Sequence, residues 1–165
     1  MVPRVLHPRV RDYFGDFDTV RDGDTLELLE NVKVTFTGWK FVDSFYSTSI
    51  GTHSNEDGTR HVLIHMDFDF YRAVNWDIRD LLPQRALYVG GVPISDAMTL
   101  GQYTYDPDTS NPHQLYSGSF TGRAQFSAAI ALVLTEEQAA HPEDIAVTFY
   151  SANYVTPCVY YLQAS

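Results

Sequence analysis

The segment H-V-L-I-H-M-D-F-D-F-Y, from His61 to Tyr71, decides the fold because apolar and polar side chains alternate along almost its whole length. Successive side chains of a β-strand point to opposite faces, so this pattern predicts one long strand with one face in the core. The predicted core face carries Val62, Ile64, Met66, Phe68 and Phe70. The opposite face carries His61, Leu63, His65, Asp67, Asp69 and Tyr71, and we expect it to meet solvent, as one face of an antiparallel sheet often does.

A second alternating segment runs from Gln125 to Leu134. One of its faces is fully apolar and belongs to the same core. The other face is made of small or apolar residues beyond Gln125, so we expect a helix or another subunit to cover it. The residues predicted to form a subunit interface are Ser127, Ala129, Ala131 and Val133.

The remaining elements of the chain are short. Further strands are expected at 25–29, at 31–36 with a bulge at Gly38, at 145–150 and at 155–162, and a hairpin at 86–94 turns at Gly90-Gly91. Short helices are expected at 75–82, with Asn75 as N-cap, and after the capping box that begins at Thr135. Segments 47–60 and 101–118 are polar and are predicted to be loops.

This order predicts an all-β fold, an antiparallel β-sandwich of jelly-roll-like type with two short crossover helices. The 165 residues are predicted to form a single domain, 1–165, in which 1–24 is an irregular N-terminal arm.

Charge and cysteine content exclude several classes of function. The net charge of −10 disfavours binding to nucleic acid or to anionic membranes, and no apolar run approaches the roughly 18 residues of a bilayer span. Nothing near the start resembles a signal peptide. Cys158 is the only cysteine, so neither an intramolecular disulfide nor a thiolate zinc cluster can form, and we interpret it as a buried small hydrophobe.

The polar row on the first strand is the densest group of chemically capable side chains. Residues i and i+2 on a strand lie about 6.6 Å apart, so His65 and Asp67 converge on one ion only by leaning together. A cupin-like metal site would use His61, His65 and Asp67, with His53 or His113 as a further ligand. The favoured interpretation is a solvated sheet face, and we predict neither a metal nor a cofactor.

Other groups that could carry chemistry have simpler interpretations. Aspartates crowd residues 16–24 at Asp16, Asp18, Asp22 and Asp24, and an irregular calcium loop is an alternative to plain acidic turns there. The chain has no G-x-S-x-G motif and no glycine pattern that cradles phosphate. No catalytic residue is predicted, and we expect the protein not to be an enzyme.

The segment from 101 to 118 is rich in tyrosine and in short polar side chains. Exposed rings can stack on sugar faces, and amides and carboxylates can bind hydroxyl groups, so the segment is a candidate for saccharide recognition. The candidate ligand-binding residues are Tyr103, Tyr105, Asp106, Asp108, Asn111, His113 and Tyr116. The alternative is a loop that packs its own tyrosines against the sheet.

The layout from His65 to Ile94, a strand followed by W-D-I-R-D-L-L-P and a hairpin ending G-G-V-P-I, resembles the globular heads of trimeric viral attachment fibres. Residues 101–162 also resemble such heads and the tips of phage tail fibres. The resemblance implies a homotrimer, a location in the virion and a receptor that can be a glycan.

Three functional hypotheses follow. The first is a non-enzymatic virion structural protein, associated with a capsid or tail, that is assembled in the host cytoplasm as a symmetric oligomer and contacts other virion proteins and a host surface glycan. The second is a cellular carbohydrate-binding module, which is expected to be monomeric. The third is a cupin-like metal-dependent enzyme. The oligomeric mass separates the first hypothesis from the others.

Overall fold

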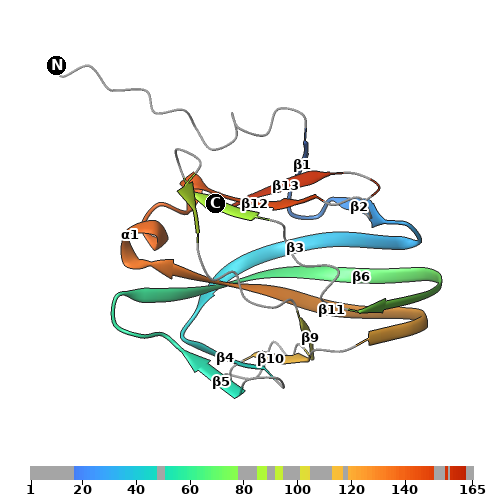
Figure 1. The fold of residues 1–165 in the computed structure, drawn as a ribbon, viewed down its shortest axis with the longest axis horizontal. Helices are drawn as coiled ribbons and strands as arrows, with labels where there is room; N and C mark the ends of the chain where they lie inside the picture. Colours follow the sequence, from blue (N-terminus) through green and yellow to red (C-terminus); the bar gives the residue numbers. More distant parts are fainter. Residues whose placement is uncertain are drawn as a thin grey trace.

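The computed structural model describes residues 17–47, 51–77, 85–88, 92–94, 101–104, 113–116, 119–150, 155 and 157–162. These residues form the predicted β-sandwich, with a five-stranded and an eight-stranded sheet (Figure 1). The smaller sheet has the order β1 (Asp18–Val20), β13 (Cys158–Leu162), β12 (Ile145–Phe149), β7 (Arg85–Tyr88) and β8 (Val92–Pro93). The larger sheet has the order β2 (Thr25–Leu29), β3 (Val32–Val42), β6 (Thr59–Asp77), β11 (Ser119–Thr135), β9 (Gly101–Thr104), β10 (His113–Tyr116), β4 (Ser44–Ser47) and β5 (Gly51–Ser54).

The two segments that alternate most clearly in the sequence form the centre of the larger sheet. Strands β6 and β11 are antiparallel and pair from Asp77 opposite Ser119 to Thr59 opposite Thr135. The five apolar residues predicted to face the core from β6 are each at most 2% exposed, which confirms that prediction. Because each of these side chains leaves water on folding, this row provides a large part of the hydrophobic stabilisation.

Aromatic rings join the two sheets. The ring of Phe36 on β3 stacks on Tyr160 of β13 with 5.0 Å between centroids, and it meets Phe149 of β12 edge-on at 5.6 Å. Both are favourable arrangements for aromatic pairs. The position of β3 over β12 and β13 is therefore specified by one side chain that contacts both strands.

A bulge in β3 shifts the alternation of its side chains by one residue, so that apolar residues on both sides of the bulge face the core. The register with β6 shifts between Phe36 and Gly38, as predicted, and Gly38 has a φ of 129°. Glycine tolerates this conformation, which other residues rarely adopt. After the bulge, Trp39 and Phe41 pack against the core between the sheets.

The eight-stranded sheet curls back on itself. Strands β4, β5, β9 and β10 lie on the side of β6 and β11 that faces away from β12 and β13 (Figure 1). We call these four strands the third layer. It is joined to β11 where Gly101 and Gln102 of β9 pair with Ala129 and Ala128, and β10 pairs with β4 in parallel. The sequence predicted loops at 47–60 and 101–118, and short strands occupy part of both segments.

Of the two predicted helices, the structure contains the one that follows β11. In α1 (Glu136–Ala139), the Gln138 amide donates to Thr135 Oγ1 and the Thr135 amide donates to Gln138 Oε1, which confirms the capping box. A 3-10 turn, η4 (Pro142–Asp144), then leads into β12. In the part of the chain described here, no helix is long and apolar enough to cross a membrane.

The predicted helix at 75–82 is wrong for its first three residues. Asn75, Trp76 and Asp77 continue β6 and pair with Thr121, Phe120 and Ser119 of β11. Pairing with a long partner strand outweighs the local N-cap signal of Asn75. The rest of that prediction, 78–82, lies outside the described residues. The hairpin at 86–94 is confirmed, because β7 and β8 are antiparallel neighbours.

Candidate functional site

The outer face of β6 is divided into a buried half and an open half. His61 and His65 are 5% and 9% exposed, and Leu63 between them is fully buried. Beyond them, Asp67 is exposed and Asp69 is half-buried. The prediction of a solvated face is therefore wrong for the first half, because the third layer lies over this side of β6 and β11 (Figure 1).

The buried half is held by side chains with structural roles. The side-chain nitrogen Nδ2 of Asn55 donates to the Val42 carbonyl at 3.3 Å. Asn55 Oδ1 accepts from the backbone amide of His61 at 2.8 Å and lies 2.6 Å from His61 Nδ1. Leu63, Ala129 and Ala131 form a small apolar cluster with Val42 packed against it. Buried polar groups normally have hydrogen-bond partners, as His61 has in Asn55, so we interpret His61 as a structural residue.

The predicted subunit interface on β11 changes accordingly. Ala129 and Ala131 are fully buried within the single chain, so neither is available to a second copy. The prediction is wrong for these two residues, because a layer from the same chain covers them. Ser127 and Val133 are half-buried, and their contact with a partner stays a prediction.

Two adjoining hollows lie on the outer face, one in its open half and one that reaches the buried half at His65. The first has a volume of about 420 Å³ and is lined by Thr25, Lys33, Thr35, Asp67, Phe68, Asp69, Gln125 and Ser127. The second has a volume of about 440 Å³ and is lined by Thr37, Gly38, Trp39, Lys40, His65, Asp67 and Ser127. Because Asp67 and Ser127 line both hollows, the two hollows meet at these residues, and we call the pair of hollows the polar groove.

Cross-strand register arranges the groove in two polar rows. In one row, Thr35 of β3, Asp67 of β6 and Ser127 of β11 lie opposite one another. In the next, Lys33, Asp69 and Gln125 do the same. Neighbouring rows lie about 6.6 Å apart on a strand. The groove thus presents hydroxyl, carboxylate, amide and ammonium groups on three adjacent strands.

Hydrogen bonds orient part of this lining. Ser127 Oγ donates to Asp67 Oδ1 at 2.6 Å, and the hydroxyl oxygens of Thr25 and Thr35 lie 2.6 Å apart. The second contact links β2 to β3, and the first links β6 to β11. Side chains held by one another lose less freedom when a ligand binds, which is the basis of preorganised recognition.

A polar cluster supports the rim of the groove at β2. The Tyr71 hydroxyl donates to Glu27 Oε1, and Lys33 Nζ lies 5.2 Å from the centroid of the Tyr71 ring. The hydrogen bond from Tyr71 lowers the pKa of Glu27, and the same bond raises the pKa of Tyr71. The contact holds the edge strand β2 against β6 across β3.

The two described strands of the tyrosine-rich segment, β9 and β10, follow β11 in the larger sheet, next to the groove. Gln102 of β9 pairs with Ala128, the residue after Ser127, and Tyr103 follows Gln102. In β10, Leu115 pairs with Tyr103, and the strand begins at His113 and ends at Tyr116. Tyr105, Asp106, Asp108 and Asn111 lie outside the described residues. Two features that are distant in the sequence are therefore neighbours in the fold.

The sequence does not predict the groove residues on β2 and β3 as site residues. Lys33 and Thr35 occupy the polar positions of an alternating strand, which is a visible signal. The signal is weak by itself, because most polar strand faces are simply wet. Only the register with β6 brings these two residues next to Asp67 and Asp69.

The alternative metal set His61, His65 and Asp67 does not converge. Within the described part of the chain, only His141, Glu143 and Asp144 bring three such ligand atoms within 4.8 Å of one another. On β6, His61 and His65 are four residues apart, with Leu63 between them on the same face. At about 3.3 Å per residue, their side chains start about 13 Å apart, which is too far to share one ion. The side chains of His53 and His113 are outside the described residues.

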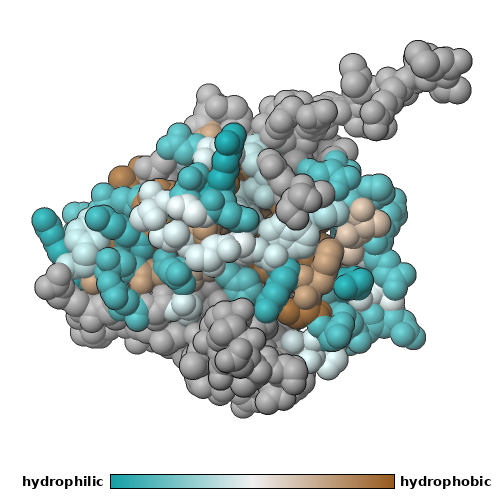
Figure 2. All heavy atoms as spheres, turned by 180° about the vertical axis from the view of Figure 1, so that it is seen from behind, coloured by the Kyte–Doolittle hydropathy of each residue, from teal (hydrophilic) through white to brown (hydrophobic). Residues whose placement is uncertain are grey.

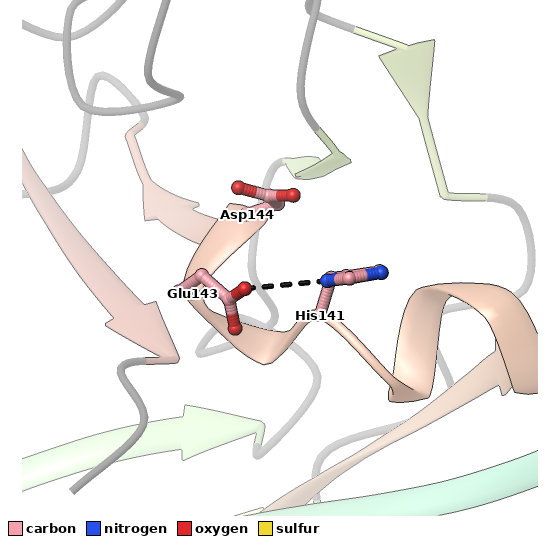
Figure 3. A group of neighbouring side chains, drawn as sticks. All are labelled: His141, Glu143 and Asp144. Atoms are coloured by element: carbon pink, nitrogen blue, oxygen red, sulfur yellow. Dashed lines mark hydrogen bonds and ion pairs between the residues drawn. The ribbon is translucent and has the colours of Figure 1, made fainter. Parts of the chain in front are cut away.

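The group at η4 is a surface cluster. Figure 3 shows His141, Glu143 and Asp144 on one turn, with His141 Nδ1 3.3 Å from Glu143 Oε1. The side chains of His141 and Glu143 are 54% and 51% exposed. Exposed pairs of this kind contribute little to stability, and nothing beyond the cluster itself points to an ion. We interpret it as an interaction that closes the turn before β12.

Two of the four aspartates of the calcium alternative, Asp22 and Asp24, have structural partners. Asp22 Oδ1 accepts from Tyr160 at 2.6 Å, and Asp24 Oδ2 accepts from the Arg21 amide at 2.9 Å. Between them, the amide of Gly23 donates to the Phe36 carbonyl, and its φ of 89° suits a turn. Asp16 lies outside the described residues, and Asp18 is exposed on β1.

Cys158 is fully buried on β13, as predicted. Burial raises the pKa of its thiol to about 12, and the nearby charge of Asp18 adds to the shift. A thiol with a raised pKa and no access to solvent is inert, because the thiolate is the reactive form.

Figure 2 shows the opposite face of the molecule from Figure 1. Teal and white side chains predominate there, and brown areas are small. Large apolar patches commonly mark protein or membrane contacts. The described residues on this face do not form such a patch.

Comparison with known proteins gives support for the fold alone. No family model matches the chain, and no curated protein matches it. A solved structure, an uncharacterized beta-sandwich protein from Clostridium difficile 630, superposes with a TM-score of 0.64 at 15% sequence identity. The match covers 89% of this chain and 95% of the other. It agrees with the β-sandwich described above.

Proposed function

We propose that this protein is a non-enzymatic saccharide-binding β-sandwich and that the polar groove is its binding site. One observation carries the proposal: two aligned polar rows, Thr35-Asp67-Ser127 and Lys33-Asp69-Gln125, form a continuous lining across three strands. The groove is open to solvent and hollowed on the described outer face.

The chemistry of the lining suits a ligand with many hydroxyl groups. Threonine and serine both donate and accept hydrogen bonds, aspartate accepts, lysine donates, and glutamine does both. A saccharide can satisfy such a mixed set, whereas an apolar ligand would leave it unpaired. Each hollow, at about 420 or 440 Å³, falls within the usual size of small-molecule sites.

The position of the groove also supports binding. Its side chains stand on paired strands, which hold a site more firmly than loops do. Strand β9, which carries Tyr103, runs beside β11 at the edge of the groove. We therefore propose that tyrosines of this segment add aromatic surface to a saccharide held by polar groups.

A glycan array followed by calorimetric titration tests the proposal. We expect Asp67→Asn and Ser127→Ala to weaken binding about tenfold or more, because a hydrogen bond to a charged group contributes about 1.5–3 kcal/mol. Asp57→Asn, on an exposed turn away from the groove, is the matched control. Absence of any saccharide ligand, or full affinity in Asp67→Asn with the fold intact, would overturn the proposal.

Two biological settings accommodate this activity. A receptor-binding protein of a virion, as the resemblance to fibre heads implies, would bind a host glycan as a symmetric trimer. A cellular carbohydrate-binding module would bind as a monomer. Light scattering of the purified protein separates them, and the trimer stays a prediction because the buried Ala129 and Ala131 no longer support it.

A further inference from the structure

Resting on the proposed function, we infer that the polar groove binds an extended acidic saccharide whose carboxylate or sulfate groups are held by Lys33 and Lys40. The inference starts from the distribution of lysine. The sequence contains 11 basic residues, of which only Lys33 and Lys40 are lysines. Both lie on β3, and each lines one of the two hollows. The nine arginines contribute nothing to the described lining of either hollow.

The charge of the groove differs from that of the chain. The whole sequence carries −10, whereas the charged side chains that line the two hollows, Lys33, Lys40, Asp67 and Asp69, have formal charges that sum to zero, and Glu27 at the rim adds one negative charge. An anionic ligand is repelled by an acidic surface in general. Within the groove it meets two ammonium groups, which bind carboxylate and sulfate oxygens as compact point charges.

The two acidic side chains of the groove are placed to bind other parts of such a ligand. Asp67 already accepts from Ser127, and Asp69 lies opposite Lys33 in the sheet. Carboxylates accept hydrogen bonds from sugar hydroxyls, so Asp67 and Asp69 fit positions between the acidic groups of the ligand. An alternation of hydroxyl-rich and anionic positions is the pattern of an acidic oligosaccharide.

The separation of the lysines sets the size of the ligand. Lys33 lies opposite Asp69 and Lys40 lies opposite Leu63, so they are six residues apart along β6, or about 20 Å at about 3.3 Å per residue. This backbone separation exceeds the length of one sugar unit, so we expect a ligand that contacts both ammonium groups to be longer than a monosaccharide. A chain of several units that follows β3 can contact both, because the two hollows meet at Asp67 and Ser127.

Calorimetric titration with a hexamer of galacturonic acid, a neutral hexamer of galactose and monomeric galacturonic acid tests this. We expect the acidic hexamer to bind at least about tenfold more tightly than the neutral hexamer at low salt, and the preference to shrink as salt screens the lysines. Lys33→Gln and Lys40→Gln should each reduce the preference severalfold. Arg21→Gln, which removes the same charge from an exposed position outside the groove, should leave it unchanged.

The outcomes separate this inference from the proposal on which it rests. Equal binding of the acidic and neutral hexamers, sensitive to Asp67→Asn, would overturn the acidic ligand and leave saccharide binding standing. Full affinity of the acidic monomer, or loss of preference with only one of the two lysine variants, would overturn the extended ligand. If neither hexamer nor any arrayed glycan bound, both the inference and the proposed function would fall.

Discussion

The hydroxyl of Tyr160 on β13 donates a hydrogen bond of 2.6 Å to Asp22 Oδ1, in the turn that carries the chain from β1 in the smaller sheet to β2 in the larger. The same tyrosine ring is 2% exposed and stacks on Phe36. Burial raises the pKa of Tyr160, and the hydrogen bond to Asp22 raises it further. The phenol therefore stays a donor well into the alkaline range, and it anchors the crossover between the sheets.

Tyr160→Phe should lower the free energy of unfolding by about 1.5–3 kcal/mol, because the variant loses a hydrogen bond to a charged acceptor but keeps the ring. Urea denaturation measures the loss. A double-mutant cycle with Asp22→Asn isolates the contact between the two residues. Strict additivity of the two single changes would show that the hydrogen bond does not stabilise the fold.

Asn55→Ala should destabilise the protein by about 2–3 kcal/mol. The side chain of Asn55 contacts the Val42 carbonyl and both the amide and the ring of His61, so one change removes three hydrogen bonds at a part-buried site. Chemical denaturation of the variant and of Asp57→Ala, an exposed neighbour, gives the comparison. A loss no greater than that of Asp57→Ala would contradict the assigned role.

Gly38→Ala should cost about 1–2 kcal/mol, because a φ of 129° is unfavourable for any residue with a Cβ. An added Cβ would meet Asp22 Oδ2 at 3.8 Å, which is ordinary contact, so the cost comes from the backbone and not from a clash. Thermal denaturation measures it. Gly58→Ala, at a φ of 81° with open space around it, should show a similar cost in a turn without a bulge.

The Cys158 thiol should not react with an aromatic disulfide reagent in the native protein at pH 8, and it should react fully in denaturant. Because it is the only cysteine, the absorbance change reports one site. Rapid reaction under native conditions would contradict its burial and the raised pKa.

The raised pKa of Cys158 also gives stability a dependence on pH. The unfolded thiol loses its proton near pH 9, whereas the native thiol holds it to about pH 12. Between these values the unfolded state binds fewer protons, so this contribution to stability falls as pH rises. Denaturation between pH 8 and pH 10 should show a shallower decline in Cys158→Ala than in the unchanged protein. Parallel curves would refute this linkage.

The fold was accessible from the sequence because its strongest signals are local. The alternation of Val62, Ile64 and Met66 with polar neighbours needs no knowledge of the rest of the chain, and neither does the capping box at Thr135. The signal at Asn75 was local as well, but pairing with β11 overrode it. Local preference thus failed where a long partner strand was available.

The site was only half accessible, because it depends on register and on layers. Asp67 was prominent in the sequence, but its companions Lys33 and Thr35 join it through the pairing of β3 with β6. The burial of Leu63, Ala129 and Ala131 on the outer face accompanies a third layer drawn from segments that resemble loops (Figure 1). Periodicity records whether a position is apolar, but it does not record what will lie above it.

The pairing of β1 with β13 has a consequence for how the molecule is made. Asp18 lies opposite Cys158, so the first described strand has no partner in its sheet until nearly all of the remaining described chain has been synthesised. Contacts between such distant segments slow folding, since a very large loop must close before they form. During synthesis β1 therefore has no partner strand for most of the time. The larger sheet, whose strands β2 to β6 emerge in succession, can begin to assemble first.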